Sequence, residues 1–179
     1  ITHRFTADPD ALVFNGRVYV YCSHDDYNNN SYDMRGYVLV SSDDMKNWYD
    51  HGEFFQVPRD ASWARLAYAP SVVERDGKFY LYFPNGANGI GVAVAETPEG
   101  PFTEPLGRPL ISRSTPNSNV AWCFDPAAFI DDDGQAYLYY GGGAHAGAPY
   151  GKNLRGIKLN DDMTSIEGAA LTIDSPDSF

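Results

Sequence analysis

A pattern that occurs three times constrains the fold of this 179-residue chain more than any other feature. The copies are DPDALVFNGRVYVY at residues 8–21, APSVVERDGKFYLY at residues 69–82 and DPAAFIDDDGQAYLY at residues 125–139. Each contains an apolar segment, a polar turn that ends in glycine, and an alternating segment rich in tyrosine, which is the signature of a β-hairpin. Successive copies begin 61 and 56 residues apart, and a repeat of tens of residues indicates a solenoid or a propeller.

Two further segments follow each hairpin and complete a predicted unit of four antiparallel strands. The third strand opens at a glycine, near residues 36–40, 91–95 and 156–159, and the fourth lies near residues 52–55, 108–111 and 170–173. We therefore predict an all-β propeller. Its domain covers residues 1–179, with blade 1 at about 5–60, blade 2 at about 66–115 and blade 3 at about 120–179. A β-sandwich also has many short strands, but it does not explain a repeated hairpin that starts with proline.

Composition narrows the classes of function. Acidic residues outnumber Lys and Arg by 24 to 13, so the formal net charge is -11 and neither nucleic acid nor an anionic membrane is an expected partner. No apolar run is long enough to span a bilayer. Cys22 and Cys123 are too few and too far apart for a disulfide framework, and we expect two buried free thiols. The chain begins at Ile1 without a signal peptide, so the compartment stays unknown.

The hairpin motifs, two of which open with Asp-Pro, resemble those of glycoside hydrolase family 43. Two turn segments, SDDMKNWYDHG at residues 42–52 and TPEGPF at residues 97–102, resemble turns of the same family. The resemblance implies a five-bladed propeller that removes arabinose or xylose from plant polysaccharides with inversion. A blade of about 60 residues would make the complete domain about 300 residues long, so we expect three blades of five in this chain.

Glycoside hydrolysis needs one carboxyl group to protonate the leaving oxygen and a second to activate water. Asp8 and Asp125 occupy equivalent positions, each before the innermost strand of its blade, and should therefore meet at the mouth of the central channel. The resemblance implies that Asp8 is the general base and that Asp125 is the third carboxylate, which tunes the acid. The acid itself is implied to be a Glu in a fourth blade, outside this chain. In the alternative, Asp-Pro merely starts a strand, but the second copy has Ala69 there, so the structure alone tolerates alanine.

Four other residues are candidate substrate contacts. Tyr68 precedes Ala69, and Trp122 stands three residues before Asp125, so either ring could lie under a sugar or pack in the core. His24 and Asp25 follow the first hairpin and could bond sugar hydroxyls, although an ordinary loop is an equal alternative.

We expect no cofactor and no metal among the site residues; a structural calcium ion in the central channel is implied by the resemblance alone. The expected function is a glycosidase of the α-L-arabinofuranosidase or β-xylosidase type, incomplete as this chain alone. The alternative is a non-catalytic sugar-binding or degenerate propeller. Because a three-blade arc leaves two blade faces uncovered, we also expect a second polypeptide or another copy of the chain to cover them.

Overall fold

The computed structural model describes residues 3–25, 31–143 and 152–174, and the twelve regular elements in these ranges are all β-strands. They form three antiparallel sheets of four strands, each built in chain order. The sheets contain β1 (Thr6–Phe14), β2 (Arg17–His24), β3 (Gly36–Ser42) and β4 (Tyr49–Gln56); β5 (Ser71–Arg75), β6 (Lys78–Pro84), β7 (Gly89–Ala95) and β8 (Ile111–Ser112); and β9 (Ala127–Ile130), β10 (Ala136–Gly141), β11 (Leu154–Leu159) and β12 (Ile166–Ile173). The predicted all-β fold of three propeller blades is confirmed.

The first two hairpins turn on the residue pairs that the sequence suggests. Asn15 and Gly16 have φ angles of 50° and 79°, and Asp76 and Gly77 have φ angles of 54° and 77°. Two successive positive φ angles match the right-handed twist of the flanking strands, and Asn-Gly and Asp-Gly adopt them most readily. The turns thus fix the register in which β1 pairs with β2 and β5 with β6.

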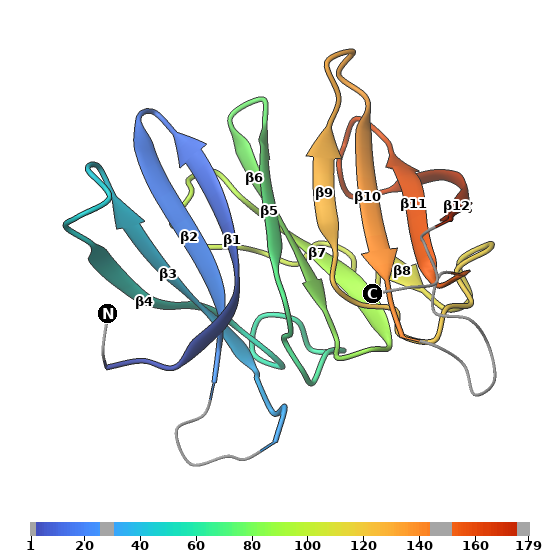
Figure 1. Cartoon of the computed structure of the whole chain (residues 1–179), viewed down its shortest axis with the longest axis horizontal. Helices are drawn as coiled ribbons and strands as arrows, with labels where there is room; N and C mark the ends of the chain where they lie inside the picture. Colours follow the sequence, from blue (N-terminus) through green and yellow to red (C-terminus); the bar gives the residue numbers. More distant parts are fainter. Residues whose placement is uncertain (1–2, 26–30, 144–151, 175–179) are drawn as a thin grey trace.

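The three sheets lie next to one another, and their first strands are neighbours (Figure 1). Strand β1 contacts β5, and β5 contacts β9, so the innermost strands line one side of a common axis as in a propeller. Each of these strands begins at the same end of its sheet. Residues that precede the innermost strands are therefore gathered at one end of the molecule.

Strand β6 shows how one blade packs against both neighbours. Because successive side chains of a strand point to opposite faces, Phe79, Leu81 and Phe83 join the apolar core between the first and second sheets. Tyr80 and Tyr82 join the core between the second and third sheets. The tyrosine-rich segments of the repeat are therefore the layer that joins one blade to the next.

A tyrosine hydroxyl reinforces each of these two cores. Tyr21 of β2 donates a hydrogen bond of 2.7 Å to the carbonyl oxygen of Pro98 in the second sheet's outer turn. Tyr82, the equivalent residue of β6, donates one of 2.8 Å to the carbonyl oxygen of Met163 in the corresponding turn of the third sheet. Both tyrosines are fully buried. The next equivalent residue is Tyr139 of β10, which is only half-buried and lies on the open face of the third sheet.

The fourth strand of the second sheet is much shorter than its counterparts. β8 has two residues, whereas β4 and β12 have eight each. The segment before β8 contains Pro98, Pro101, Pro105 and Pro109, which cannot donate backbone hydrogen bonds to a ladder.

Cys22 and Cys123 are both buried and free, as predicted. Within the described ranges no helix is long and apolar enough to cross a membrane.

Candidate active site

A β-bulge sets the orientation of Asp8. Ala7 pairs with Ser23 and Asp10 pairs with Tyr21, so Asp8 and Pro9 together lie opposite a single residue of β2. Such an extra residue bends a strand and redirects a side chain, and bulges are common beside active sites. Asp8 also has a φ angle of 50°. This left-handed conformation is uncommon for a residue with a side chain.

Asp125 has the same unusual backbone conformation, with a φ angle of 46°. Ala69, at the equivalent position of the second blade and within the described part of the chain, does not have a positive φ. The repeat can therefore be built without this conformation, and only the two blades that carry aspartate adopt it. Strain of this kind persists where the surroundings enforce it, often at functional sites.

Asp8 and Asp125 lie at one pocket of about 430 Å³. Two of the predicted aromatic residues, Tyr68 and Trp122, line the same pocket. The structure thus brings together four of the six predicted site residues at the end where the innermost strands begin. The complete lining is Asp8, Tyr32, Met34, Tyr68, Ala87, Trp122, Phe124 and Asp125.

The surroundings raise the pKa of Asp125 from 3.8 to about 6. The main cause is the loss of water around its carboxyl group, although the residue as a whole stays exposed, and the negative charge of Asp8 adds to the shift. The influence of Asp8 on this pKa agrees with the placement of both residues at one pocket. A pair of carboxyl groups with one perturbed pKa is an arrangement that can divide acid and base roles.

Gly143 leaves room for the ring of Trp122 at the pocket. A side chain on Gly143 would collide with the indole, with a Cβ atom only 2.5 Å from its nearest ring atom. The indole also meets the ring of Phe124 edge to face, with centroids 5.4 Å apart. Trp122 nevertheless remains 48% exposed, so one face of the ring is available to a ligand.

Two hydrogen bonds fix Tyr68. The hydroxyl of the buried Tyr37 donates to the carbonyl oxygen of Tyr68 at 2.7 Å. The hydroxyl of Tyr68 donates to the carbonyl oxygen of Tyr32 at 2.9 Å. Tyr68 therefore joins the start of the second blade to the segment before β3, across the pocket.

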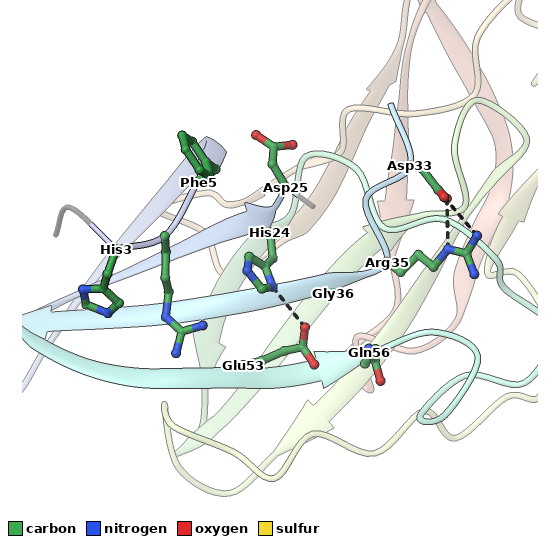
Figure 2. Close-up of a pocket in the computed structure, with 10 residues that line it drawn as sticks. His3, Phe5, His24, Asp25, Asp33, Arg35, Gly36, Glu53 and Gln56 are labelled. Carbon is green, nitrogen blue, oxygen red and sulfur yellow. Dashed lines mark hydrogen bonds and ion pairs between the residues drawn. The ribbon is translucent and has the colours of Figure 1, made fainter. Parts of the chain in front are cut away.

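His24 and Asp25 lie at a different pocket, of about 620 Å³, on the open face of the first sheet (Figure 2). His24 Nδ1 lies 3.2 Å from Glu53 Oε2, and these two side chains point toward each other in Figure 2. Gly36 lies beside them, and a Cβ atom there would be 2.5 Å from Glu53 Oε2, so the carboxylate of Glu53 would have to move away. Both predicted residues stand at the same end of the first blade as Asp8, but they do not line the pocket that holds it.

Sequence reasoning missed Tyr32 and Met34, which line the pocket of Asp8. They lie in the connection between β2 and β3, which has no strand pattern. The one available signal was that this connection follows the first hairpin at the same end as Asp8.

The described residues contain no group of three or more His, Cys, Asp or Glu side chains that could hold a metal ion. Calcium also takes carbonyl oxygens and water molecules as ligands, so the ion that the resemblance implies stays a prediction.

Two carboxylates, the exposed ring of Trp122 and the half-buried ring of Tyr68 gather where the blades of a β-propeller meet. They define a candidate site of the carbohydrate-hydrolysing class. Comparison with known proteins agrees. The family model "Glycosyl hydrolases family 43" matches residues 1–178. The chain belongs to glycosyl hydrolase family 43.

Named relatives lie in the same family. The chain is 44% identical over 208 residues to an arabinoxylan arabinofuranohydrolase of Bacillus subtilis, with 100% of this chain and 40% of the relative covered. It is 50% identical to an α-L-arabinofuranosidase structure from Clostridium thermocellum, with a TM-score of 0.85 over 98% of this chain and 58% of that one. The B. subtilis arabinofuranohydrolase structure, in complex with cellotetraose, gives a TM-score of 0.89 at 43% identity over 98% of this chain and 42% of that one.

Proposed function

We propose that this chain supplies two of the three catalytic carboxylates of an inverting glycosidase that removes arabinofuranose or xylose from plant polysaccharides. The observation that carries the proposal is the shared pocket of Asp8 and Asp125, which have the same strained backbone at equivalent repeat positions. Relatives named arabinoxylan arabinofuranohydrolase and xylosidase/arabinosidase support the choice of sugar.

Asp8 is the general base in this proposal. It is exposed at the pocket, so a water molecule can reach it and give up a proton as it attacks the anomeric carbon. Asp125 is the third carboxylate. Its raised pKa keeps part of the population protonated near pH 6, so it can hold and tune a neighbouring acid without adding a full negative charge.

The general acid comes from outside these 179 residues in this proposal. The chain spans 40% of the B. subtilis relative, which leaves room for further blades in a protein of that length. Glu167 is no substitute, because it is exposed on β12 and lines the open face of the third sheet.

Tyr68 and Trp122 are proposed to bind the sugar. The rigid, partly exposed ring of Trp122 offers an apolar plane to the C–H face of a pyranose or furanose. His24 and Asp25 are proposed to contact the polysaccharide at the end of the first blade that also carries Asp8, because the rest of their pocket lies on a sheet face that a closed propeller covers.

We further propose that additional polypeptide of the same repeat covers the third sheet. Tyr21 and Tyr82 each donate a hydrogen bond to a carbonyl oxygen of the following blade. Tyr139 occupies the equivalent position in the third blade, and its hydroxyl has no such acceptor among the described residues. A following blade would supply that acceptor. Another copy of this chain is the alternative.

Activity assays on the full-length protein test the proposal. We expect hydrolysis of 4-nitrophenyl α-L-arabinofuranoside or β-D-xyloside and release of the same sugar from arabinoxylan. A non-catalytic sugar-binding propeller, the second candidate, would bind xylo-oligosaccharides in calorimetry and release nothing. Binding without release would therefore reject the hydrolase.

A further inference from the structure

Asp10 joins the innermost strands of the first two blades. Its Oδ2 atom accepts a hydrogen bond of 2.6 Å from the backbone N–H of Val72 in β5. Its Oδ1 atom accepts one of 2.9 Å from the N–H of Ala11 in its own strand. One carboxylate therefore satisfies two backbone donors and ties β1 to β5 next to the candidate active site.

The same link recurs one blade further on. Ser71 occupies the position of Asp10 in the second copy of the repeat, and its Oγ atom accepts a hydrogen bond of 3.1 Å from the N–H of Ala128 in β9. The donors Val72 and Ala128 also occupy equivalent positions. The link joins equivalent positions twice, so it is a repeated feature of the contact between neighbouring innermost strands. The third copy has Ala127 there, which carries no acceptor.

The link stands at the edge of the bulge that holds Asp8. Regular pairing of β1 with β2 is interrupted after Ala7 and resumes at Asp10. On the first side, Ser23 Oγ donates to the carbonyl oxygen of Ala7 at 3.0 Å. On the second side, the bond from Asp10 to Val72 fixes the strand. The unpaired stretch that carries Asp8 is thus held between two side-chain anchors.

We propose that Asp10 is a positioning residue that holds Asp8 at its distance from Asp125 and Tyr68 across the blade boundary. The proposal rests on the function proposed above. Aspartate suits this place because it has two acceptor oxygens. The N–H groups of Val72 and Ala128 each donate to a side chain of the preceding blade. The N–H group of Ala11, at the equivalent position of the first blade, donates instead to Asp10 of its own strand.

Kinetics of Asp10 variants in the full-length protein test this role. Asp10→Ala, which copies Ala127, is expected to lower kcat on an aryl arabinofuranoside or xyloside at least about tenfold with KM nearly unchanged, since small displacements of a catalytic group are costly. Asp10→Ser copies Ser71 and can remake the bond to Val72, so it is expected to restore most of kcat. Exchange of the Val72 amide proton, followed by NMR, should quicken in Asp10→Ala and recover in Asp10→Ser.

Asp44→Ala is the matched control. Asp44 Oδ1 also accepts from two backbone N–H groups, those of Lys46 and Asn47, but it lies in the turn at the other end of the first blade. Its loss is expected to lower stability and leave kcat unchanged. Equal kcat values for Asp10→Ala, Asp44→Ala and the wild type would overturn the positioning role, as would a failure of Asp10→Ser to restore kcat.

A substitute is available if Asp10→Ala does not fold. Asp10→Val fills most of the same space and suits a strand but has no acceptor for the N–H of Val72, so kcat is expected to fall at least about tenfold, as in Asp10→Ala. An unchanged kcat in Asp10→Val would overturn the proposal. An inactive wild type would instead reject the proposed function, which separates the two failures.

Discussion

Asp125 combines a strained backbone with a pKa that is raised by desolvation and, to a smaller extent, by the charge of Asp8. Both properties cost stability, and both belong to the residues that the proposed reaction needs. The second blade avoids the positive φ angle, and the two carboxylates repel each other. Such costs are typical of residues retained for chemistry.

The pKa of Asp125 makes stability depend on pH. Because its folded pKa of about 6 is above the ordinary 3.8, Asp125 favours the fold fully below about pH 4, and this contribution is lost as the pH rises through 6. Asp125→Asn removes the titration. We expect its melting temperature to exceed that of the wild type above pH 6 by more than any difference seen at pH 4, in thermal unfolding followed by circular dichroism.

The pKa of Asp44 is shifted in the opposite direction, so Asp44→Asn should change stability with pH in the opposite way. Hydrogen bonds from the backbone of Asn47 and then Lys46 lower the pKa of Asp44. Its contribution is therefore present above about pH 4 and lost as the pH falls further. We expect Asp44→Asn to melt below the wild type at pH 7, with a smaller gap at low pH. For Asp125, a stability difference between Asp125→Asn and the wild type that stays the same from pH 4 to 7 would contradict its raised pKa.

Sequence reasoning found four residues of the pocket because repeat equivalence carries geometric information. Asp8 lies near the start of β1, and Tyr68, Trp122 and Asp125 lie a few residues before β5 and β9. Rotation about an axis brings such positions together, and all four line one pocket. His24 was predicted on different grounds, because it directly follows the first hairpin in the sequence. Residues alternate across β2, so His24 shares the open face with Cys22 and lies at a different pocket.

At the scale of the strand, tyrosines of the second hairpin strand determine how blades join. The sequence predicts that these residues alternate, but the direction in which their hydroxyls reach needs the structure. Tyr21 and Tyr82 both reach forward along the chain, to turns of the next sheet. The turns at Asn15-Gly16 and Asp76-Gly77 could be predicted directly from the sequence. The two-residue length of β8 could not, because it depends on how the four preceding prolines limit backbone pairing.

Removing a tyrosine hydroxyl tests its hydrogen bond to the next sheet. Tyr82→Phe leaves the carbonyl oxygen of Met163 without its buried donor and is expected to cost about 1–2 kcal/mol in the free energy of unfolding. Tyr139→Phe should cost a similar amount in the full-length protein and almost nothing in the 179-residue chain. Urea unfolding of both variants in both proteins measures this. Equal costs in the short chain would show that Tyr139 already has its partner there.

At the scale of the whole molecule, the described chain is an arc of three sheets with two open faces. Val13 of the first sheet is 67% exposed, and Phe129 and Leu171 of the third sheet are 51% and 69% exposed. Closed propellers bury such faces between blades, and exposed apolar patches promote association.

The 179-residue chain alone is therefore expected to self-associate, as light scattering at increasing concentration would reveal. Leu171→Lys combined with Val13→Lys places charge on both open faces and should shift the chain toward monomer. A concentration-independent monomer in the unmodified chain would contradict the role of these faces.

The most direct test of the central claim is the turnover of Asp8→Asn in the full-length protein. General-base catalysis contributes about 10²–10⁴-fold, so we expect kcat on an aryl arabinofuranoside or xyloside to fall at least about a hundredfold. Calorimetric binding of a xylo-oligosaccharide should be retained, because the amide keeps the size of the side chain. Asp44→Asn controls for loss of an unrelated carboxylate. An Asp8→Asn variant that hydrolyses at the native rate would show that Asp8 is not the general base.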